Sequence, residues 1–330
     1  MFRLKIHLLG AEEVTKAISM KEAIEAVKEA FILVSQKKVV VPERTHLDLA
    51  SHQGTSLIMP AYYPEKEKIG LKIINLYEKN PLFGLPHSYA LMLIFDARNG
   101  APLALLEAAH LTALRTGAAC GLATDLLARK EAKIAAIFGA GFQARYQLEA
   151  IRAVRSLTKV YLYDPDYAKS QTFAEEISGK FGIEVEVASS PEEACQRAEI
   201  ISTATTSSTP VFPDSAIKPG VHINAIGSYK PQVREVPSAT VARAKIFVDQ
   251  KEAALEEAGD LIIPLKEGMI TEKAIVAEIG EVASGQKPGR TSAEEITFFK
   301  TVGLAAQDIA LACRILETAE RLNLGSKFEL

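Results

Sequence analysis

The chain has 330 residues, of which 48% are hydrophobic, and a formal net charge of −3 at pH 7. This length suits two domains with a core each, and the slight negative charge provides no basic surface for nucleic acid. No apolar run reaches the roughly 18 residues of a membrane helix, and residues 1–7 lack the apolar core of a secretory signal, so we expect a cytoplasmic protein with no membrane partner.

The first third of the chain predicts an α+β domain. Residues 19–22 form a capping box, and the apolar periodicity that follows predicts an amphipathic helix. Short strands separated by turns are then expected at 42–45, 56–60, 70–74, 89–95 and 102–106. The pair Asn99-Gly100 favours a tight hairpin, so the last two strands should pair in antiparallel fashion.

From about residue 111 onwards, strands and helices alternate. A helix of small residues at 111–129 is followed by a strand, a glycine turn, a helix and a second strand, which together span 133–163. Further strands are expected at 184–188, 200–204, 221–226 and 245–248. Ser190 should cap one of the helices between them. This alternation predicts an α/β fold of the Rossmann type, a doubly wound parallel sheet whose ligands bind beyond the carboxyl ends of the strands.

The glycine turn has the residues that a dinucleotide needs. Gly139 lets the chain leave the strand sharply, and Gly141 lets the backbone approach a pyrophosphate. The small Ala144 lets the following helix lie close to the sheet. Unpaired N–H groups at the start of that helix would then bind the phosphates.

An acidic residue ends the next strand. Asp164 suits hydrogen bonds from the adenosine ribose hydroxyls, and no Arg follows it in 164–167 to bind a 2′-phosphate. This arrangement favours NAD(H) over NADP(H) as the cofactor. In the alternative interpretation, Asp164 only caps the turn before Pro165.

The C-terminal region predicts two helices. A capping pattern at 292–295 should begin the first of them. The second, at 303–321, carries one apolar stripe from Ala305 to Ala319, and we expect it to pack on the first domain or on a second subunit. Residues 323–327 should form the end of this helix and a frayed tail.

The three cysteines predict neither a disulfide framework nor a metal site. Cys120, Cys195 and Cys313 lie far apart, are odd in number and include no CxxC pair. Their alanine-rich surroundings favour burial.

Cationic residues interrupt apolar segments of the first domain at Arg44, Lys72 and Arg115. Lys72 lies inside the apolar strand 70–74, where an ammonium group is costly to bury without a partner. That partner is either an internal acid or the carboxylate of a bound substrate. Arg115 stands almost alone in a small-residue helix, and its guanidinium suits a planar oxyanion.

Several motifs together resemble the ornithine cyclodeaminase and mu-crystallin family. They follow the family's order over essentially the whole chain, at 42–44, 59–61, 70–72, 111–118, 139–144 and 294–305. The resemblance implies a homodimer. It also implies a discontinuous domain of residues 1–112 and 303–330 for substrate binding and dimerisation, and a dinucleotide-binding domain of residues 113–302.

The resemblance also implies roles for individual residues. The substrate, a small-molecule carboxylate, would be bound by Arg44, Lys72, Arg115 and Val302. Lys72 would serve as the proton donor or acceptor. His87 or a held water is an alternative source of the proton, although the family carries a small hydroxyl residue at that position. In the other interpretation, His87 is a surface or turn histidine. The residues expected to contact the dinucleotide are Arg115, Thr116, Gly139, Gly141, Phe142, Gln143, Asp164, Thr205, Ile226, Gly227, Ser228, Tyr229 and Thr301.

Two positions depart from the cyclodeaminases of this family. Tyr229 stands where those enzymes carry an Asp that handles the proton and the substrate amine. Leu57 stands where they carry an acid that holds the distal amine of ornithine. A buried site without both carboxylates would solvate a diammonium substrate poorly, at a cost of several kcal/mol.

We therefore expect an NAD(P)H-dependent oxidoreductase that reduces Δ1-pyrroline-2-carboxylate to L-proline, or Δ1-piperideine-2-carboxylate to pipecolate. This hypothesis requires the three cations to converge on the substrate and to stay clear of internal acids. One alternative is an L-alanine dehydrogenase or an ornithine cyclodeaminase that recruits another acid, such as Asp48 or Glu78. Another is an NAD(P)H-dependent ligand-binding protein similar to mu-crystallin.

Overall fold

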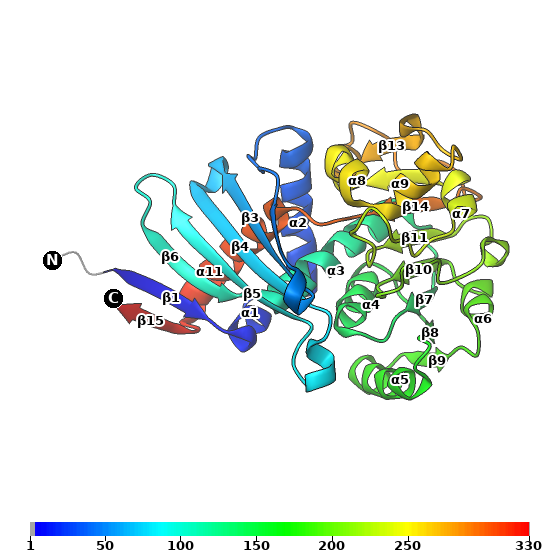
Figure 1. The fold of residues 1–330 in the computed structure, drawn as a ribbon, viewed down its shortest axis with the longest axis horizontal. Coiled ribbons are helices and arrows are strands. Elements are labelled where there is room, and N and C mark those ends of the chain that lie inside the picture. The colour runs from blue at the N-terminus through cyan, green and yellow to red at the C-terminus, as the bar shows by residue number, and fades with distance from the viewer. Residues whose placement is uncertain (1–3, 330) are drawn as a thin grey trace. The chain divides into compact units, whose positions relative to one another are not determined.

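The computed structural model describes residues 4–329 and divides the chain into two compact units (Figure 1). Unit 1 comprises Met1–Arg115 and Leu304–Leu330, and unit 2 comprises Thr116–Gly303. Residues 113–115 therefore fall in the first unit and Gly303 in the second, a small departure from the predicted boundaries.

Unit 1 is built on a seven-stranded sheet with the order β15-β1-β6-β5-β4-β3-β2. Neighbouring strands are antiparallel except for β1 and β6, which are parallel. The strands are β1 (Lys5–Leu9), β2 (Thr45–Leu49), β3 (Gly54–Tyr63), β4 (Lys68–Tyr77), β5 (Ser88–Asp96), β6 (Pro102–Glu107) and β15 (Ser326–Glu329). The predicted hairpin of β5 and β6 is confirmed. The prediction of a strand at 42–45 was wrong, because 42–44 is irregular and only leads into β2.

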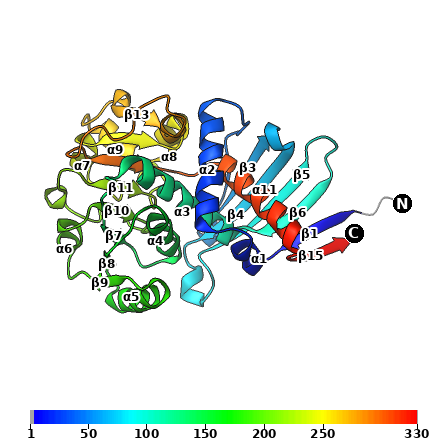
Figure 2. The ribbon, with the colours of Figure 1, turned by 180° about the vertical axis from the view of Figure 1, so that it is seen from behind.

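The helix α11 (Ala305–Leu322) packs on one face of this sheet, and α2 (Met20–Ser35) packs against α11 (Figure 2). The capping box of α2 is confirmed, since the Ser19 side chain accepts from the Glu22 N–H and the Glu22 carboxylate accepts from the Ser19 N–H. The apolar stripe of α11 from Ala305 to Ala319 is buried and packs on β3, β4, β5 and α2. The last helix therefore packs on the first domain.

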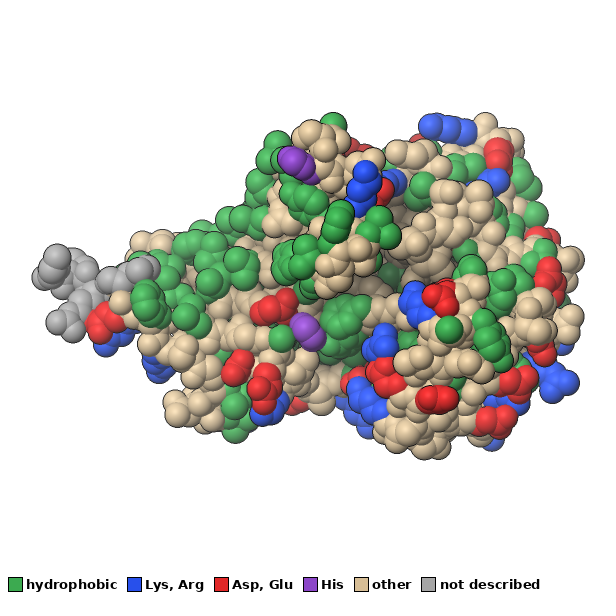
Figure 3. Space-filling view, turned by 60° about the horizontal axis from the view of Figure 1, so that its bottom comes forward, with side chains coloured by type: hydrophobic (Ala, Val, Ile, Leu, Met, Phe, Trp, Pro, Cys, Tyr) green, Lys and Arg blue, Asp and Glu red, His purple; other side chains and the backbone are tan. Residues whose placement is uncertain are grey.

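The opposite face of the sheet is apolar, and no helix of unit 1 within residues 4–329 crosses it (Figure 1). Side chains alternate across a strand, so the residues of β4 between the buried Gly70, Lys72 and Ile74 point to this other side. Figure 3 shows hydrophobic side chains gathered over unit 1. We call this surface the open sheet face, and its central residues are Tyr62, Ile69, Leu71, Ile73, Leu91 and Leu93.

The chain end after α11 is ordered by the sheet. Asn323 ends the helix in a left-handed conformation, with φ 52°, and β15 then pairs with β1. The prediction of a helix end was correct, and the prediction of a frayed tail was wrong. The short polar strand gives little signal of its own, and its order comes from pairing with the otherwise open edge of β1.

Unit 2 contains an eight-stranded sheet with the order β13-β12-β14-β11-β10-β7-β8-β9, in which all neighbours are parallel. The predicted doubly wound α/β sheet is confirmed. Its strands are β7 (Ile134–Phe138), β8 (Lys159–Tyr163), β9 (Glu184–Val187), β10 (Ile200–Thr203), β11 (His222–Ala225), β12 (Lys245–Val248), β13 (Ile275–Glu278) and β14 (Thr297–Lys300).

Helices bury both faces of the parallel sheet, which is why the residues of its central strands β10, β11 and β14 are all buried. On β7, Ala135 and Ile137 face one core while Ala136 and Phe138 face the other. The remaining α-helices are α1 (Ala11–Lys16), α3 (Ala108–Leu127), α4 (Phe142–Val154), α5 (Tyr167–Phe181), α6 (Pro191–Gln196), α7 (Ser238–Ala242), α8 (Lys251–Glu257), α9 (Gly259–Lys266) and α10 (Ile279–Ala283). Short 3-10 helices lie at Ala50–His52, Pro64–Lys66, Asn80–Phe83, Asp214–Ala216 and Glu272–Ala274.

The helix predicted to begin at 292–295 does not exist. This segment is irregular and leads directly into the buried strand β14. The Glu295 carboxylate accepts from the Thr291 N–H at 2.9 Å and pairs with Lys245 at 2.5 Å. The capping pattern was misleading because its acid folds back onto a loop instead of a helix start. Ser190 does cap α6, as predicted.

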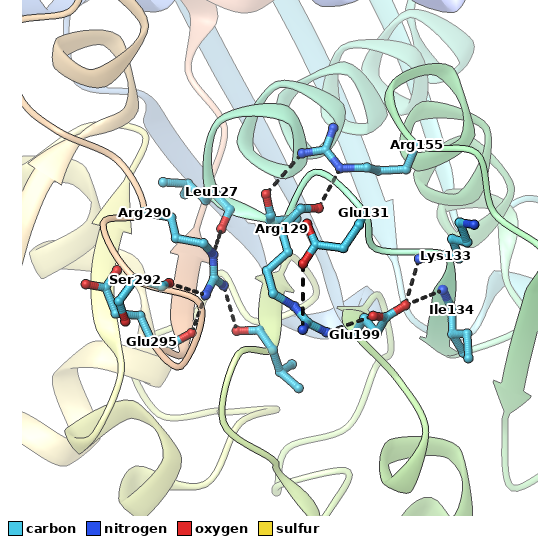
Figure 4. A network of polar contacts seen from close by, with 12 residues as sticks. Leu127, Arg129, Glu131, Lys133, Ile134, Arg155, Glu199, Arg290, Ser292 and Glu295 are labelled. Atoms are coloured by element: carbon cyan, nitrogen blue, oxygen red, sulfur yellow. Dashed lines mark hydrogen bonds and ion pairs between the residues drawn. The ribbon is translucent and has the colours of Figure 1, made fainter.

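A polar network holds the amino ends of the unit 2 strands (Figure 4). Arg155 donates to the carbonyls of Thr124, Ala128 and Arg129 at the end of α3. The Glu199 carboxylate pairs with Arg129 and accepts from the N–H groups of Lys133 and Ile134. This network stabilises the end of the sheet at which the strands begin. The loops at the opposite end, beyond the carboxyl ends of the strands, are therefore left for ligands.

The sequence also raised the questions of cysteine pairing, metal binding and membrane helices. All three cysteines are buried, with free thiols. Within residues 4–329, no group of His, Cys, Asp and Glu is arranged to hold a metal ion. No helix in the same range is long and apolar enough to span a membrane.

Candidate active site

Lys72 lies at the centre of β4 and points under α11. Its side chain is 1% exposed, and its Nζ lies 2.6 Å from Oδ2 of Asp308, in the first turn of α11. The ammonium group therefore has a buried anionic partner, as an apolar strand requires. The sequence left open whether this partner is an internal acid or the carboxylate of a bound substrate. The structure shows an internal acid, Asp308.

The same carboxylate also pairs with Arg115. Arg115 Nε donates to Asp308 Oδ1 at 3.1 Å, and its Nη1 donates to Gln307 Oε1 at 3.3 Å. Gln307 and Asp308 are completely buried. The expectation that Lys72 and Arg115 would stay clear of internal acids was therefore wrong. The requirement attached to the ketimine hypothesis was too strict, because one carboxylate neutralises only one of the two cations that share it.

One carboxylate shared by two cations leaves an excess of positive charge in this cluster. The pKa of Lys72 is lowered to about 7: burial is the largest cause, the charges of Arg115 and Arg44 also lower it, and Asp308 acts to raise it. Arg44, partly buried just before β2, thus belongs to the same electrostatic environment. Near pH 7 the Lys72 amine is poised between donating and accepting a proton, and the cluster can accept a second anion.

The structure does not bring His87 to this cluster. His87 is exposed just before β5, whereas Lys72 lies opposite Met92 in the β4–β5 register. His87 lies five positions before Met92 along an extended segment, a distance of about 16 Å. The alternative acids Asp48 and Glu78 are also exposed, and Asp48 accepts from Thr55 at 3.0 Å.

In unit 2, the glycine turn lies at the point where the sheet order reverses, between β7 and β10. Gly139 has φ +99°, and a Cβ there would meet the Ala204 carbonyl oxygen at 2.7 Å. Gly141 precedes α4, no side chain caps that helix, and a Cβ at Gly141 would meet nothing within 4 Å. The Gln143 Oε1 is buried without a hydrogen-bond partner. An open glycine turn at a helix start that no side chain caps fits the pyrophosphate of a dinucleotide.

Asp164 lies directly beside this turn. Its carboxylate accepts from the N–H groups of Ala140 at 2.9 Å and Asp166 at 3.0 Å. Although burial acts to raise its pKa, these bonds and the ammonium of Lys169 hold the pKa below its usual value. Asp164 therefore stays ionised and caps the turn. It lies directly after β8, the position from which we predicted that it would bind the ribose hydroxyls.

The other predicted cofactor residues lie in the loops after β10, β11 and β14. Thr205 follows β10, and Ile226, Gly227, Ser228 and Tyr229 follow β11. The Thr205 and Gly227 N–H groups both donate to Glu235, a completely buried acid. The Ser228 hydroxyl donates to the Val233 carbonyl at 2.6 Å.

A second buried acid holds the segment after β14. Asp249 Oδ2 accepts from the Thr301 hydroxyl at 2.6 Å and from the N–H groups of Val302 and Gly303, both at 2.8 Å. Thr116 is buried in α3, where unit 2 begins. The residues predicted to bind the dinucleotide thus lie on six segments of unit 2, except Arg115, which belongs to unit 1.

Three important acids were missed by the sequence analysis. The sequence could have indicated Asp308, because this acid lies on the apolar stripe of α11 between Ala305 and Ala312, where a buried charge needs a partner. Asp249 directly follows the apolar strand β12. Glu235 lies in a loop and gave no signal.

A doubly wound parallel sheet with an open glycine turn at its switch point defines a Rossmann-type dinucleotide-binding protein. Unit 1 adds a buried cluster in which Lys72 and Arg115 share the carboxylate of Asp308. The chain belongs to the ornithine cyclodeaminase/mu-crystallin family, whose model matches residues 5–323.

Relatives match almost the whole chain. A Δ1-pyrroline-2-carboxylate reductase of Bacillus cereus is 42% identical over 98% of this chain and 99% of that protein. The mouse (Mus musculus) ketimine reductase mu-crystallin is 33% identical over 92% of this chain and 94% of that protein.

Solved structures of relatives have the same fold. The Δ1-pyrroline-2-carboxylate reductase of Thermococcus litoralis, in complex with NADH and L-proline, has a TM-score of 0.95 and 44% identity, covering 97% of this chain and 99% of that one. An archaeal alanine dehydrogenase dimer with bound NAD has a TM-score of 0.92 and 38% identity, covering 98% of this chain and 99% of that one.

Proposed function

We propose that this protein is an NADH-dependent reductase of a small cyclic ketimine acid, with Δ1-pyrroline-2-carboxylate as substrate and L-proline as product. The observation that carries the proposal is the buried cluster in which Lys72 and Arg115 share the single carboxylate of Asp308. Its excess positive charge suits a substrate with one carboxylate. The relative solved with NADH and L-proline, 44% identical to this chain, supports this choice of substrate.

In the proposed mechanism, Arg44, Lys72 and Arg115 bind and orient the substrate carboxylate. Orientation of this kind contributes much of the rate enhancement in bimolecular reactions. Lys72 holds a proton for the imine nitrogen, which its pKa of about 7 allows at neutral pH. The nicotinamide, when bound, supplies the hydride that reduces C2 of the C=N bond. Asp308 keeps the two cations in place and reduces the repulsion between them.

We assign dinucleotide binding to unit 2 and substrate binding to unit 1. The N–H groups at the start of α4 would hold the pyrophosphate, and Thr205, Gly227 and Thr301 would line the rest of the cofactor site. Asp164 supports NAD(H) over NADP(H), because its ionised carboxylate would accept from ribose hydroxyls and repel a 2′-phosphate. Lys169, 3.2 Å from that carboxylate, offsets part of this repulsion.

Ornithine is a poor fit to unit 1. Leu57, which takes the place of an acid in cyclodeaminases, is buried on β3 and is 5% exposed. A second ammonium group of the substrate would there meet an aliphatic side chain and lose its hydration without compensation.

A steady-state assay tests the function. We expect NADH oxidation with Δ1-pyrroline-2-carboxylate at a kcat/KM about tenfold or more above that with pyruvate and ammonia, and a lower kcat/KM when NADPH replaces NADH. Two results would contradict the proposal: ammonia release from ornithine, or NADH-dependent binding of the ketimine without turnover. Faster reduction of pyruvate with ammonia would instead favour an alanine dehydrogenase, the activity of a relative 38% identical to this chain.

We further propose that the open sheet face joins two copies of this chain into a homodimer. Exposed apolar patches of this kind mark interaction surfaces, and the archaeal alanine dehydrogenase relative is a dimer. Leu71 lies at the centre of the face, opposite Pro60 on β3 and Leu93 on β5.

Changing Leu71 to Arg is expected to convert the dimer into a monomer, because a desolvated charge without a partner would lie at the centre of the interface. Sedimentation velocity should show a fall in mass from twice 35.7 kDa to 35.7 kDa. Met269→Arg is the matched control, since Met269 is an exposed apolar residue of unit 2. A wild-type monomer, or a Leu71→Arg protein that remains dimeric, would refute this assignment.

A further inference from the structure

Glu235 joins two loops at the carboxyl edge of the unit 2 sheet. It lies between β11 and α7 and is completely buried. Its Oε2 accepts from the Thr203 hydroxyl at 2.9 Å and from the Gly227 N–H at 2.6 Å. Its Oε1 accepts from the Thr205 N–H at 2.7 Å. One carboxylate therefore bonds to the ends of both β10 and β11.

The backbone around Glu235 is itself fixed by a second buried acid. Asp260 Oδ1 accepts from the N–H groups of Glu235 at 2.8 Å and Val236 at 3.0 Å. Asp260 Oδ2 accepts from Lys300 Nζ at 2.9 Å, at the end of β14. A Cβ on Gly259 would lie 1.9 Å from the Val233 carbonyl oxygen, so α9 packs tightly against this loop. Glu235 thus has little freedom to move.

The two loops that Glu235 joins touch each other. A Cβ on Gly227 would lie 2.4 Å from the Thr205 carbonyl oxygen and 2.6 Å from Glu235 Oε1. The spacing between the loops is therefore set by backbone contact and by the carboxylate. A change at Glu235 must change the positions of the Thr205 and Gly227 backbones.

Burial of this acid opposes its ionisation. Burial and the nearby Asp260 raise the pKa of Glu235, against the effect of Lys300 and of its hydrogen bonds from Thr205. The hydrogen bonds that its carboxylate accepts from backbone N–H groups offset only part of this desolvation. An acid kept in an unfavourable environment next to a ligand-binding edge is a candidate for a functional role.

We propose that Glu235 is a positioning residue for the dinucleotide: it holds the loops after β10 and β11 at the spacing that the cofactor needs, without touching the cofactor. This inference rests on the proposed function, namely that unit 2 binds NAD(H). It assigns control of cofactor affinity to a residue outside the set predicted to contact the dinucleotide.

The test is Glu235→Gln, compared with Glu199→Gln. In the first variant, the NH₂ group of the new amide replaces a carboxylate oxygen that accepts hydrogen bonds from the loops. A donor would then face a donor, so the loops should separate. Glu199 is the matched control: it also accepts from two backbone N–H groups in the same sheet, but at the amino ends of the strands. NADH fluorescence titration gives the Kd, and thermal unfolding gives the Tm of each protein.

We expect Glu235→Gln to raise the Kd for NADH about tenfold or more, equivalent to about 1.4 kcal/mol. We expect Glu199→Gln to lower the Tm while leaving this Kd within about twofold of wild type. In steady-state assays, Glu235→Gln should raise the KM for NADH more than it lowers kcat. A Glu235→Gln protein with an unchanged Kd would overturn the inference, as would equal losses of NADH affinity in the two variants.

Thr203→Val keeps the test decisive if Glu235→Gln does not fold. This variant removes only the hydroxyl bond to Glu235 and preserves the shape of the side chain. Its Kd for NADH should rise several-fold, with a smaller fall in Tm than in Glu235→Gln, because only one hydrogen bond of Glu235 is lost. An unchanged Kd would again refute the role. If the wild-type protein bound no NADH, the proposed function itself would fail, an outcome distinct from a loss confined to the variants.

Discussion

Replacing Lys72 by Met is expected to lower kcat/KM for ketimine reduction by about 10³-fold, within the range for loss of a general acid. The variant loses both a contact to the substrate carboxylate and the proton for the imine nitrogen. Its Kd for NADH should stay close to wild type, because Lys72 belongs to unit 1 and the glycine turn to unit 2. Steady-state kinetics and fluorescence titration measure the two quantities.

The pH dependence distinguishes a proton donor from a simple anion contact. The pKa of Lys72 is about 7, so its ammonium form predominates below pH 7 and is lost as the pH rises through 7. Reduction by the wild-type protein should therefore decline above pH 7, while the residual activity of Lys72→Met should lack this step. Lys68→Met, on the same strand but partly exposed, is the control and should behave as wild type. The role assigned to Lys72 is refuted if Lys72→Met keeps a tenth of the activity.

Asp308→Asn is expected to have the largest effect on stability. It leaves Lys72 and Arg115 buried close together without their shared anion, and breaking a buried ion pair in this way costs about 3–5 kcal/mol of unfolding free energy. Urea unfolding measures the loss. Glu317→Gln is the control on the same helix: its pair with Lys66 is half exposed and contributes at most about 1 kcal/mol.

The same substitution should also shift the activity profile. Asp308 raises the pKa of Lys72, so without its charge the ammonium form should be lost at a lower pH. The decline in reductase activity would then begin below pH 7. An Asp308→Asn protein with wild-type stability and an unshifted profile would show that this carboxylate is not the counter-ion of Lys72.

Errors in the sequence analysis fall where local pattern and long-range packing disagree. The capping pattern at 292–295 suggested a helix, but the strand β14 that follows it is ordered by its neighbours β11 and β12. The polar end of the chain suggested a frayed tail, but β15 covers the edge of β1. In both cases tertiary pairing outweighed a weak local preference.

The sequence by itself determined the glycine turn between β7 and α4, the alternation of strands and helices around it, and the amphipathic helix α11. These features follow from spacing along the chain, because side-chain periodicity and glycine conformation are local properties. The sequence also indicated that Lys72, in an apolar strand, needed an anionic partner. Only the tertiary structure decided that this partner is Asp308, and that Glu235 joins the loops after β10 and β11. The pairing of buried charges depends on which distant segments pack together, and periodicity along the chain carries no information about that choice.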